Sequence, residues 1–328
     1  MKIATYHLGI ELTQRCNLDC NHCFRGEMHN VNISREILEK VFDEVKYVHV
    51  LDLSGGEVFL GYEQLKMLLE IADKKGTRID NCSMIINGTV YDQRIYDLLD
   101  EYFGDYYQVG ISDDDFHEKS IQRIYGKNKD SLEIIKKNML LHLENPHSIG
   151  YIRVSKHLIE NGRALSLDTP KKQFETSGYY YSLYGNGCFV GPVIFIGADG
   201  YISDINSDIE KRQEQSIGNI KNATIFDSLL NGGIRIECDL ENPFAFFEKR
   251  ETEFMTHQGD HLVFKDNKMA HIAFTPDTKY WEAIDKLQED MIAFTQAAED
   301  GKLDEFFANW DPIYDGDLSQ IEHTKIVY

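Results

Sequence analysis

The sequence predicts an α/β fold in which parallel strands form an open sheet or a partial barrel, followed by a smaller α+β region. Three observations support this prediction. Short apolar runs alternate with helix-like segments through the first half of the 328 residues. Polar residues collect where the expected strands end, which is the ligand-binding edge of parallel α/β architectures. The alternation stops after Gly162, and we therefore expect one domain over residues 1–185 and a second over 186–328.

The individual elements follow from apolar spacing and from the residues that begin or end helices. Apolar residues recur at helical spacing from Ile37 to Val45, and Gly76 is suited to end the next helix. Strands are expected over residues 7–12, 49–53, 83–86, 107–111 and 150–154. Helices are expected over residues 34–48, 62–75, 91–103 and 130–144. In the second domain we expect a β-hairpin that turns at Ala198-Asp199-Gly200, and helices over residues 243–257 and 278–299.

The chain is strongly acidic, with 34 Lys and Arg against 55 Asp and Glu and a formal charge of -21. Such a field repels phosphate backbones and anionic lipids, so we expect neither a nucleic-acid polymer nor a membrane as a partner. No basic segment followed by an apolar run begins the chain, and no apolar stretch approaches the roughly 18 residues that span a bilayer. We therefore expect a cytoplasmic protein.

Three of the six cysteines, Cys16, Cys20 and Cys23, lie in one short stretch with the spacing C-x3-C-x2-C. Clustered thiols in a large chain without a secretory signal are more often metal ligands than disulfides. A structural zinc ion needs a fourth ligand, which His22, His29 or a remote cysteine would have to supply. An iron–sulfur cubane held by three cysteines keeps one iron open for chemistry. Both interpretations are consistent with the spacing alone.

The surroundings of this loop resemble the radical S-adenosylmethionine (radical SAM) superfamily, whose loop is C-x3-C-x-aromatic-C after the first barrel strand. His22 takes the aromatic position, and the stretch from Ser54 to Glu57 resembles the superfamily's G-G-E motif. The resemblance covers roughly residues 5–165 and implies a partial (β/α)6 TIM-like barrel. It also implies one [4Fe–4S] cluster held by Cys16, Cys20 and Cys23. The implied contacts to S-adenosylmethionine are His22, Phe24, Ser54, Gly55, Gly56, Glu57, Asn87, Ser112 and Arg153.

The resemblance further implies an enzyme that reductively cleaves S-adenosylmethionine to a 5′-deoxyadenosyl radical, which takes hydrogen from a substrate. A flavodoxin- or ferredoxin-type protein would supply the electron. The cofactors carry this chemistry, and the protein positions them and excludes water. Arg153 would meet the methionine carboxylate through a bidentate fork, although a structural ion pair is an equal alternative.

An acidic run follows the fourth expected strand, at the mouth of the expected pocket. It can be a solvated loop, or it can hold a polar or cationic substrate and transfer protons. The candidate catalytic residues are Asp113, Asp115 and His117, with Asp114 between them. Further along the chain, Gly162-Arg163-Ala164 resembles a short sequence that is common near the end of the radical SAM core.

The C-terminal region resembles a SPASM or twitch extension, in which further cysteines bind auxiliary clusters. Ile205 stands where that extension has a cysteine, and Cys188 and Cys238 cannot complete a four-cysteine site by themselves. We therefore expect a single cluster, with the extension acting as a lid over the substrate. Cys82 is expected to be a buried, inert thiol.

We expect a small-molecule substrate rather than a peptide, because we expect no auxiliary clusters and, with the first strand expected so near the start of the sequence, no peptide-recognition domain. In overall size and in its cluster-free C-terminal half the chain resembles queuine lyases, which release a 7-deazaguanine base. The enzymatic alternative is a peptide-modifying radical SAM maturase. The alternative from another class is a non-catalytic iron–sulfur or zinc protein.

Overall fold

A computed structural model describes residues 1–112, 114–152, 158–168, 171–172, 179–184, 187–203, 207–235, 261–265 and 268–272. The chain divides into two compact units, Met1–Lys249 and Arg250–Tyr328. The strands of the first unit are β1 Lys2–Thr13, β2 Val45–Gly55, β3 Arg78–Ile86, β4 Tyr107–Ser112, β5 Ser148–Ile152, β6 Leu158–Ile159, β7 Lys171–Lys172, β8 Tyr180–Tyr184, β9 Gly187–Ile196, β10 Tyr201–Ser203, β11 Gly218–Asn219 and β12 Ile234–Arg235. Its helices are α1 Arg35–Glu44, α2 Tyr62–Lys74, α3 Gln93–Phe103, α4 Asp115–Tyr125, α5 Lys129–Glu144, α6 Arg212–Gln215 and α7 Ile225–Gly232, with 3-10 turns η1 Val58–Leu60 and η2 Gly162–Ser166.

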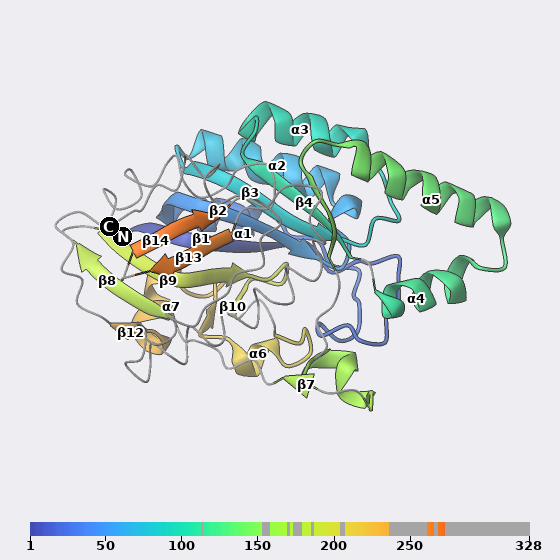
Figure 1. Ribbon diagram of the computed structural model, residues 1–328. Helices are drawn as coiled ribbons and strands as arrows, with labels where there is room; N and C mark the ends of the chain where they lie inside the picture. The colour runs from blue at the N-terminus through green and yellow to red at the C-terminus, as the bar shows by residue number, and fades with distance from the viewer. Residues whose placement is uncertain are drawn as a thin grey trace. The chain divides into compact units, whose positions relative to one another are not determined.

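The main sheet is mixed, and its parallel part forms the expected α/β partial barrel (Figure 1). The strand order is β11-β10-β9-β1-β2-β3-β4-β5, and β9 together with β1 to β5 runs parallel. Helices α1, α2 and α3 connect successive strands, as right-handed βαβ crossovers require. The predicted fold class is therefore confirmed.

The sixth parallel strand comes from a segment that the sequence assigned to the C-terminal extension. β9 pairs with β1 from Lys2 opposite Gly187 to Ile10 opposite Ile196. The predicted hairpin then turns back through Gly200, which has φ of 90°, into β10. The extension thus begins as part of the core sheet, and the boundary at residue 185 remains a prediction.

The end of α1 differs from the sequence expectation. The helix ends at Glu44 rather than at residue 48, because Val45 is already extended, with φ of -74° and ψ of 121°. β2 then starts at Val45 and is longer than the predicted 49–53. The run of β-branched and aromatic residues from Val45 to Val50 favours a strand, and it overrides the helical spacing that ends at Val45.

Asp114 and Asp115 of the acidic run lie at the start of helix α4, which the sequence analysis did not predict. Asp114 is the N-cap, and its side chain accepts hydrogen bonds from the backbone N–H groups of Phe116 and His117. Asp115 and Glu118 occupy the first turn, where acidic side chains complement the helix dipole. N-capping by Asp114 and the acidic first turn therefore stabilise the start of α4.

The core of the first unit lies between the sheet and its helices. Leu8, Ile10 and Leu12 of β1 are fully buried, as are Phe42 of α1 and Leu65 of α2. Cys82 lies in this core with no exposed surface, and its pKa is raised well above the ordinary value by burial. Cys188 of β9 is also buried there.

In the second unit, β13 His261–Lys265 and β14 Lys268–Ile272 form an antiparallel pair that the sequence did not predict. The predicted helices over residues 243–257 and 278–299, Cys238 and Ile205 lie outside the described residues. Among the residues that are described, no helix combines the length and apolar character needed to cross a membrane.

Candidate cofactor and substrate site

The three clustered cysteines lie in the loop that follows β1, beyond the carboxyl end of that strand. All three are free thiols; Cys20 is buried, and Cys16 and Cys23 are partly buried. The backbone N–H of Leu18 donates to Sγ of Cys16 over 3.4 Å. Burial raises the pKa of Cys16 to about 12 and that of Cys20 to about 11, and the neighbouring cysteines add to both shifts. A metal that binds Cys16 and Cys20 as thiolates must therefore displace protons from them.

The Ser-Gly-Gly-Glu turn packs directly on the chain that leads into the cysteine loop. The backbone N–H of Gly56 donates to the Thr13 carbonyl, and that of Glu57 donates to the Arg15 carbonyl, each over 2.8 Å. A Cβ on Gly56 would lie 2.3 Å from the Arg15 carbonyl oxygen and 2.9 Å from Cβ of Cys16. Glycine is required at this position because the two segments approach so closely.

We expect Gly56→Ala to separate this turn from the cysteine loop. Because displacements of about 1 Å can cost up to hundredfold in a positioned site, S-adenosylmethionine binding after anaerobic reconstitution should weaken by at least about tenfold. Gly76→Ala is the control: Gly76 has φ of 65°, but nothing lies within 4 Å of its Cβ position. That variant should lose stability without losing binding. Equal binding by the Gly56 variant and wild type would contradict the close packing.

Glu57 and Asn87 join the ends of β2 and β3 beside Cys16. The Glu57 carboxylate, only 2% exposed, accepts from the backbone N–H of Phe59 over 3.0 Å and from that of Asn87 over 2.8 Å. Nδ2 of Asn87 donates to the side chain of Asn17 over 3.0 Å and lies 3.8 Å from Sγ of Cys16. The Glu57 side chain therefore positions the backbone of Asn87, and the Asn87 side chain in turn contacts Cys16.

The carboxyl of Glu57 predicts a distinctive pH dependence of stability. Burial raises its pKa to about 7 from 4.5, against the lowering by its two backbone donors. Because the pKa is higher in the folded state, its stabilising contribution is full below pH 4.5 and is lost as pH rises through 7. This amounts to about 3 kcal/mol in the free energy of unfolding. Urea unfolding of the cluster-free protein at several pH values should show this slope in wild type and not in Glu57→Gln; equal slopes would refute it.

His22, Asp114 and His117 meet where the cysteine loop contacts the start of α4. Oδ2 of Asp114 lies 2.6 Å from Nδ1 of His117 and 4.0 Å from Nε2 of His22. The ring of His22 stacks on Phe116 with centroids 4.7 Å apart and meets His117 edge-on at 4.8 Å. The ligand atoms of Cys20, His22 and His117 all lie within 4.8 Å of one another. Nδ1 of His22 is buried and has no hydrogen-bond partner among the described residues.

The predicted catalytic residues are only partly assembled at this point. His117 is present, but its carboxylate partner is Asp114, which the sequence analysis considered with the acidic run but did not select as catalytic. Asp115 is exposed in the first turn of α4. Ser112 ends β4, beside Ile152 of β5. Asp113 and Arg153 lie outside the described residues.

Phe24 and the segment around Gly162 complete the wall of the cysteine loop. The guanidinium of Arg25 lies 5.5 Å from the centroid of the Phe24 ring. A Cβ on Gly162 would be 2.4 Å from the Phe24 carbonyl oxygen, and the backbone N–H of Arg163 donates to the Cys23 carbonyl over 2.9 Å. The Gly162-Arg163-Ala164 segment therefore packs against the cysteine loop.

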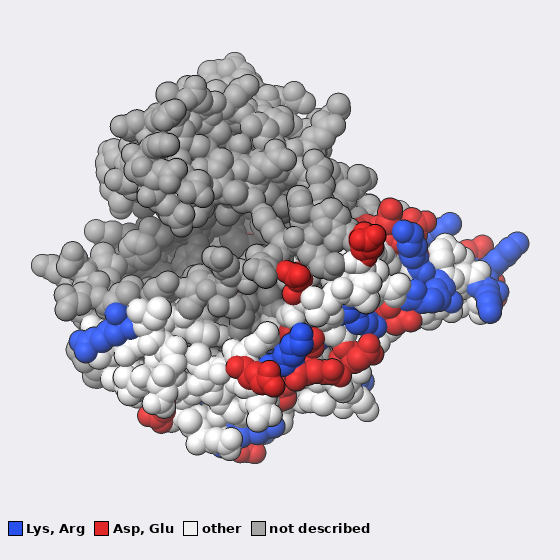
Figure 2. Space-filling model, turned by 90° about the horizontal axis from the view of Figure 1, so that it is seen from below, with Lys and Arg blue, Asp and Glu red and all other residues white. Residues whose placement is uncertain are grey.

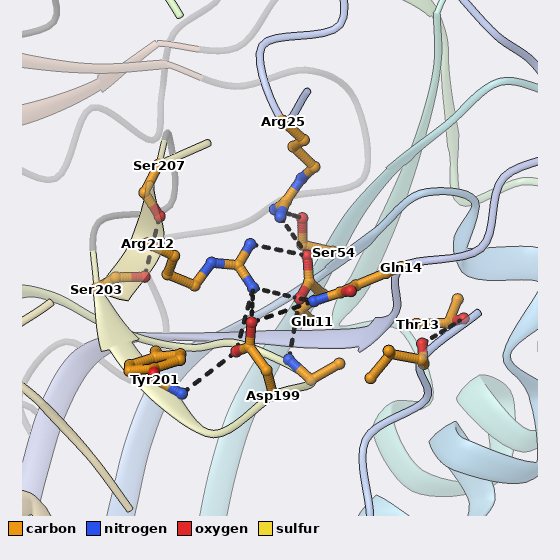
Figure 3. A network of polar contacts seen from close by, with 12 residues as sticks. Glu11, Thr13, Gln14, Arg25, Ser54, Asp199, Tyr201, Ser203, Ser207 and Arg212 are labelled. Atoms are coloured by element: carbon orange, nitrogen blue, oxygen red, sulfur yellow. Dashed lines mark hydrogen bonds and ion pairs between the residues drawn. The ribbon is translucent and has the colours of Figure 1, made fainter. Parts of the chain in front are cut away.

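A buried polar network beside the loop was not anticipated from the sequence (Figure 3). Glu11 of β1, fully buried, accepts from Arg25 over 2.5 Å and from Arg212 of α6 over 2.7 Å. Arg25 also donates to Ser54 over 2.5 Å. Arg212 reaches Asp199 in the β9–β10 turn at 3.2 Å. The network links the cysteine loop, the Ser-Gly-Gly-Glu turn and the C-terminal hairpin.

The two neighbouring arginines favour the ionised form of Glu11. Burial by itself raises the pKa of Glu11, but the charges of Arg25 and Arg212 lower it overall. The network thus holds a carboxylate between two buried guanidinium groups. In the sequence, Glu11, Arg25 and Arg212 are separate charged residues, and no local pattern indicates that they meet.

The described part of the chain thus combines a parallel α/β sheet with a loop of three free thiols that follows β1. Residues 10–146 match the family model described as the Radical SAM superfamily. These residues form a radical SAM domain. Members of this superfamily are enzymes that use a [4Fe–4S] cluster and S-adenosylmethionine. The expected superfamily and its cofactors are confirmed at this level.

Three curated relatives resemble part of the chain. A Methanococcus aeolicus protein named GTP 3′,8-cyclase is 27% identical over 45% of this chain and 50% of its own length. The Bacillus subtilis peptide biosynthesis protein YydG is 27% identical over 47% of this chain and 49% of its own. The S-adenosylmethionine-dependent nucleotide dehydratase of Selenomonas ruminantium is 25% identical over 42% and 49%. The chain spans about half the length of the curated relatives it matches.

Proposed function

We propose that this protein is a radical SAM enzyme that cleaves S-adenosylmethionine and abstracts hydrogen from a polar small molecule. The observation that carries the proposal is the packing of the Ser-Gly-Gly-Glu turn on the backbone that leads into Cys16, within a matched radical SAM domain. The donor set fits a cluster, since three free thiols share one loop and a backbone N–H is directed at Cys16.

In this proposal Cys16, Cys20 and Cys23 hold one [4Fe–4S] cluster. When bound, the cluster and S-adenosylmethionine supply a 5′-deoxyadenosyl radical. Gly55 and Gly56 allow the turn to pack closely on the chain that leads into the loop, and the proposal places S-adenosylmethionine beside this turn. The proposal also includes contacts between S-adenosylmethionine and His22, Phe24, Asn87, Ser112 and Arg153.

In this proposal the Asp114–His117 pair binds or moves a proton at the edge of the site. Burial raises the pKa of Asp114, but the hydrogen bond and charge of His117 lower it overall, so the carboxylate stays ionised and orients the imidazole. Asp113 and Asp115 remain proposed substrate contacts. The C-terminal extension is proposed to cover the substrate.

We favour a substrate with a nucleobase-like ring, including a 7-deazapurine of the queuine type. Support comes from the names of two relatives, the GTP cyclase and the nucleotide dehydratase. The test is to incubate the reduced, reconstituted enzyme with queuine, with common nucleotides and with a metabolite extract, and to record mass changes together with 5′-deoxyadenosine. A peptide as the sole stimulating compound would overturn this substrate class.

A peptide-modifying maturase is the second candidate because one relative, YydG, is named for peptide biosynthesis. The acidic chain would suit a basic precursor peptide. Tighter binding of a basic peptide than of nucleobases would favour it.

A non-catalytic zinc or iron–sulfur protein is the third candidate. The gathering of Cys20, His22 and His117 is a plausible zinc donor set. Metal and sulfide analysis after anaerobic purification separates these cases, since zinc without sulfide would support a zinc protein.

Free thiols in the loop and the core also fit the reducing cytoplasm, where we propose that the protein functions.

A further inference from the structure

The two faces of the parallel sheet differ in character. One face belongs to the buried core together with side chains of α1, α2 and α3, for example through Ile10, Leu53 and Val109. Side chains alternate along a strand, so the residues between these point to the other face. Parallel sheets are usually apolar on both faces. Here the second face is largely polar and carries His7, Glu11, Asp52, Ser83, Gln108 and Ser112.

One row of this polar face crosses the strands β1 to β4. Strand pairing sets Asp52 of β2 opposite Gly9 of β1 on one side and opposite Ser83 of β3 on the other, and Ser83 is opposite Gln108 of β4. The hydroxyl of Ser83 donates to Oδ1 of Asp52, and Nδ1 of His7 lies 2.9 Å from Oδ2. Two side chains therefore orient the carboxylate, and we call His7, Asp52 and Ser83 the Asp52 cluster.

The Asp52 cluster is accessible on this face of the sheet. The side chain of Asp52 is 22% exposed and that of His7 is 35% exposed. Ile85, the next residue of β3 on the same face, is 59% exposed although β3 lies between β2 and β4. A large apolar side chain in the middle of a parallel sheet is normally covered. An open apolar surface beside a few placed polar groups is typical of a small-molecule site.

The carboxylate of Asp52 has different neighbours from the charged groups on the outer surface. Figure 2 shows Lys and Arg interspersed with Asp and Glu on one face of the molecule. Asp52 instead contacts a histidine and a serine, which use two of the roughly four acceptor positions that a carboxylate offers. Each of its oxygens can therefore accept one further hydrogen bond. Such a group fits a ligand edge that presents two N–H donors side by side.

The Asp52 cluster lies close to the position proposed for S-adenosylmethionine. Asp52 is two residues before Ser54, which begins the Ser-Gly-Gly-Glu turn. At about 3.3 Å per residue, Asp52 is about 7 Å from Ser54 along β2. A ring bound at Asp52 and Ile85 would therefore lie next to the turn.

We propose that Asp52 determines substrate specificity by accepting hydrogen bonds from the paired N–H donors of a guanine-type ring. In a ring of this type, N1–H and the 2-amino group donate side by side. Ile85 contacts the ring face, and His7 and Ser83 orient the carboxylate. The inference rests on the proposed function and states which edge of its nucleobase-like substrate the protein recognises.

The test compares 7-deazaguanine with 7-deazaadenine, which share a ring system but differ at this edge. The adenine-type ring presents an acceptor nitrogen beside its amino group, and that nitrogen would face the carboxylate without a proton. Calorimetry on the reconstituted protein with S-adenosylmethionine should show that wild type binds 7-deazaguanine at least about tenfold more tightly. In Asp52→Asn this preference should fall to less than about threefold, because the amide replaces one acceptor with a donor.

Two further variants separate recognition from folding. Asp80→Asn is the matched control: Oδ2 of Asp80 lies 3.4 Å from Nδ1 of His49, but Asp80 is two residues before Cys82 and so lies on the core face of the sheet. This control should keep the wild-type preference. Ser83→Ala removes one donor to Asp52 without changing the charge, and it should weaken 7-deazaguanine binding by at least about threefold.

The outcomes distinguish this inference from the proposed function. The assignment of Asp52 would be overturned by a wild type without the preference, by an unchanged preference in Asp52→Asn, or by unchanged 7-deazaguanine binding in Ser83→Ala. Tighter binding of an arginine-containing peptide than of 7-deazaguanine would also overturn it, since a guanidinium presents paired N–H donors too. Failure of the wild type to bind iron and sulfide, or to form 5′-deoxyadenosine, would instead overturn the proposed function.

Discussion

Replacing Cys20 with serine is expected to abolish cluster binding and, with it, cleavage of S-adenosylmethionine. Wild type should contain about four irons and four sulfides per chain after anaerobic reconstitution, whereas Cys20→Ser should keep less than about a quarter of that iron. Because the cofactor carries the chemistry, 5′-deoxyadenosine formation should fall to the level without protein.

Cys82→Ala is the matched control for this variant. It also removes one thiol, but Cys82 is fully buried in the core, away from the loop. The control should lose stability and retain its iron. If Cys20→Ser bound iron and sulfide as wild type does, the assignment of the three cysteines would be wrong.

The second large effect is expected at Glu11, whose carboxylate stands between two buried guanidinium groups. Glu11→Gln leaves Arg25 and Arg212 without their shared counter-charge, and removing one partner of a buried pair typically costs about 3–5 kcal/mol. Urea unfolding of the cluster-free protein should show this loss in the free energy of unfolding. Glu36→Gln is the control, because Glu36 pairs with Lys40 on the exposed surface of α1 and should change stability by less than about 0.5 kcal/mol.

The pH dependence of this difference gives an independent check. The pKa of Glu11 is lowered in the folded state, so its stabilising contribution is present above its ordinary value of 4.5 and is lost as the pH falls through the folded pKa. The gap between wild type and Glu11→Gln should therefore be largest near neutral pH and shrink in acid. A gap that is small at neutral pH would mean that the network contributes little to stability.

The sequence was sufficient for those features whose determinants are local. The alternation of strands and helices predicted the parallel sheet, because each element is specified by its own apolar spacing. The cysteine spacing predicted a metal-binding loop, and the two glycines before Glu57 predicted a turn at the end of the second strand. The structure brings these segments together at the hydrogen bond between the Glu57 N–H and the Arg15 carbonyl.

Features that depend on long-range pairing were not predictable in this way. Glu11 and Arg212 are separated by 201 positions, and isolated charged residues are usually solvent-exposed. Pairing of β9 with β1 was also hidden, because the apolar run near residue 194 indicates a buried strand but not its neighbour. The start of α4 did carry a local signal: Asp114 as an N-cap, acidic residues in the first turn and Ile121 on the buried side.

The most direct measurement of the central claim is the anaerobic reaction of the reconstituted, dithionite-reduced protein with S-adenosylmethionine, followed by mass spectrometry. We expect 5′-deoxyadenosine and methionine in equal amounts from wild type and from Cys82→Ala, and neither product above background from Cys20→Ser. Purified wild-type protein that holds zinc without sulfide and forms no 5′-deoxyadenosine under these conditions would contradict the assignment of the Cys16–Cys20–Cys23 loop as a catalytic cluster site.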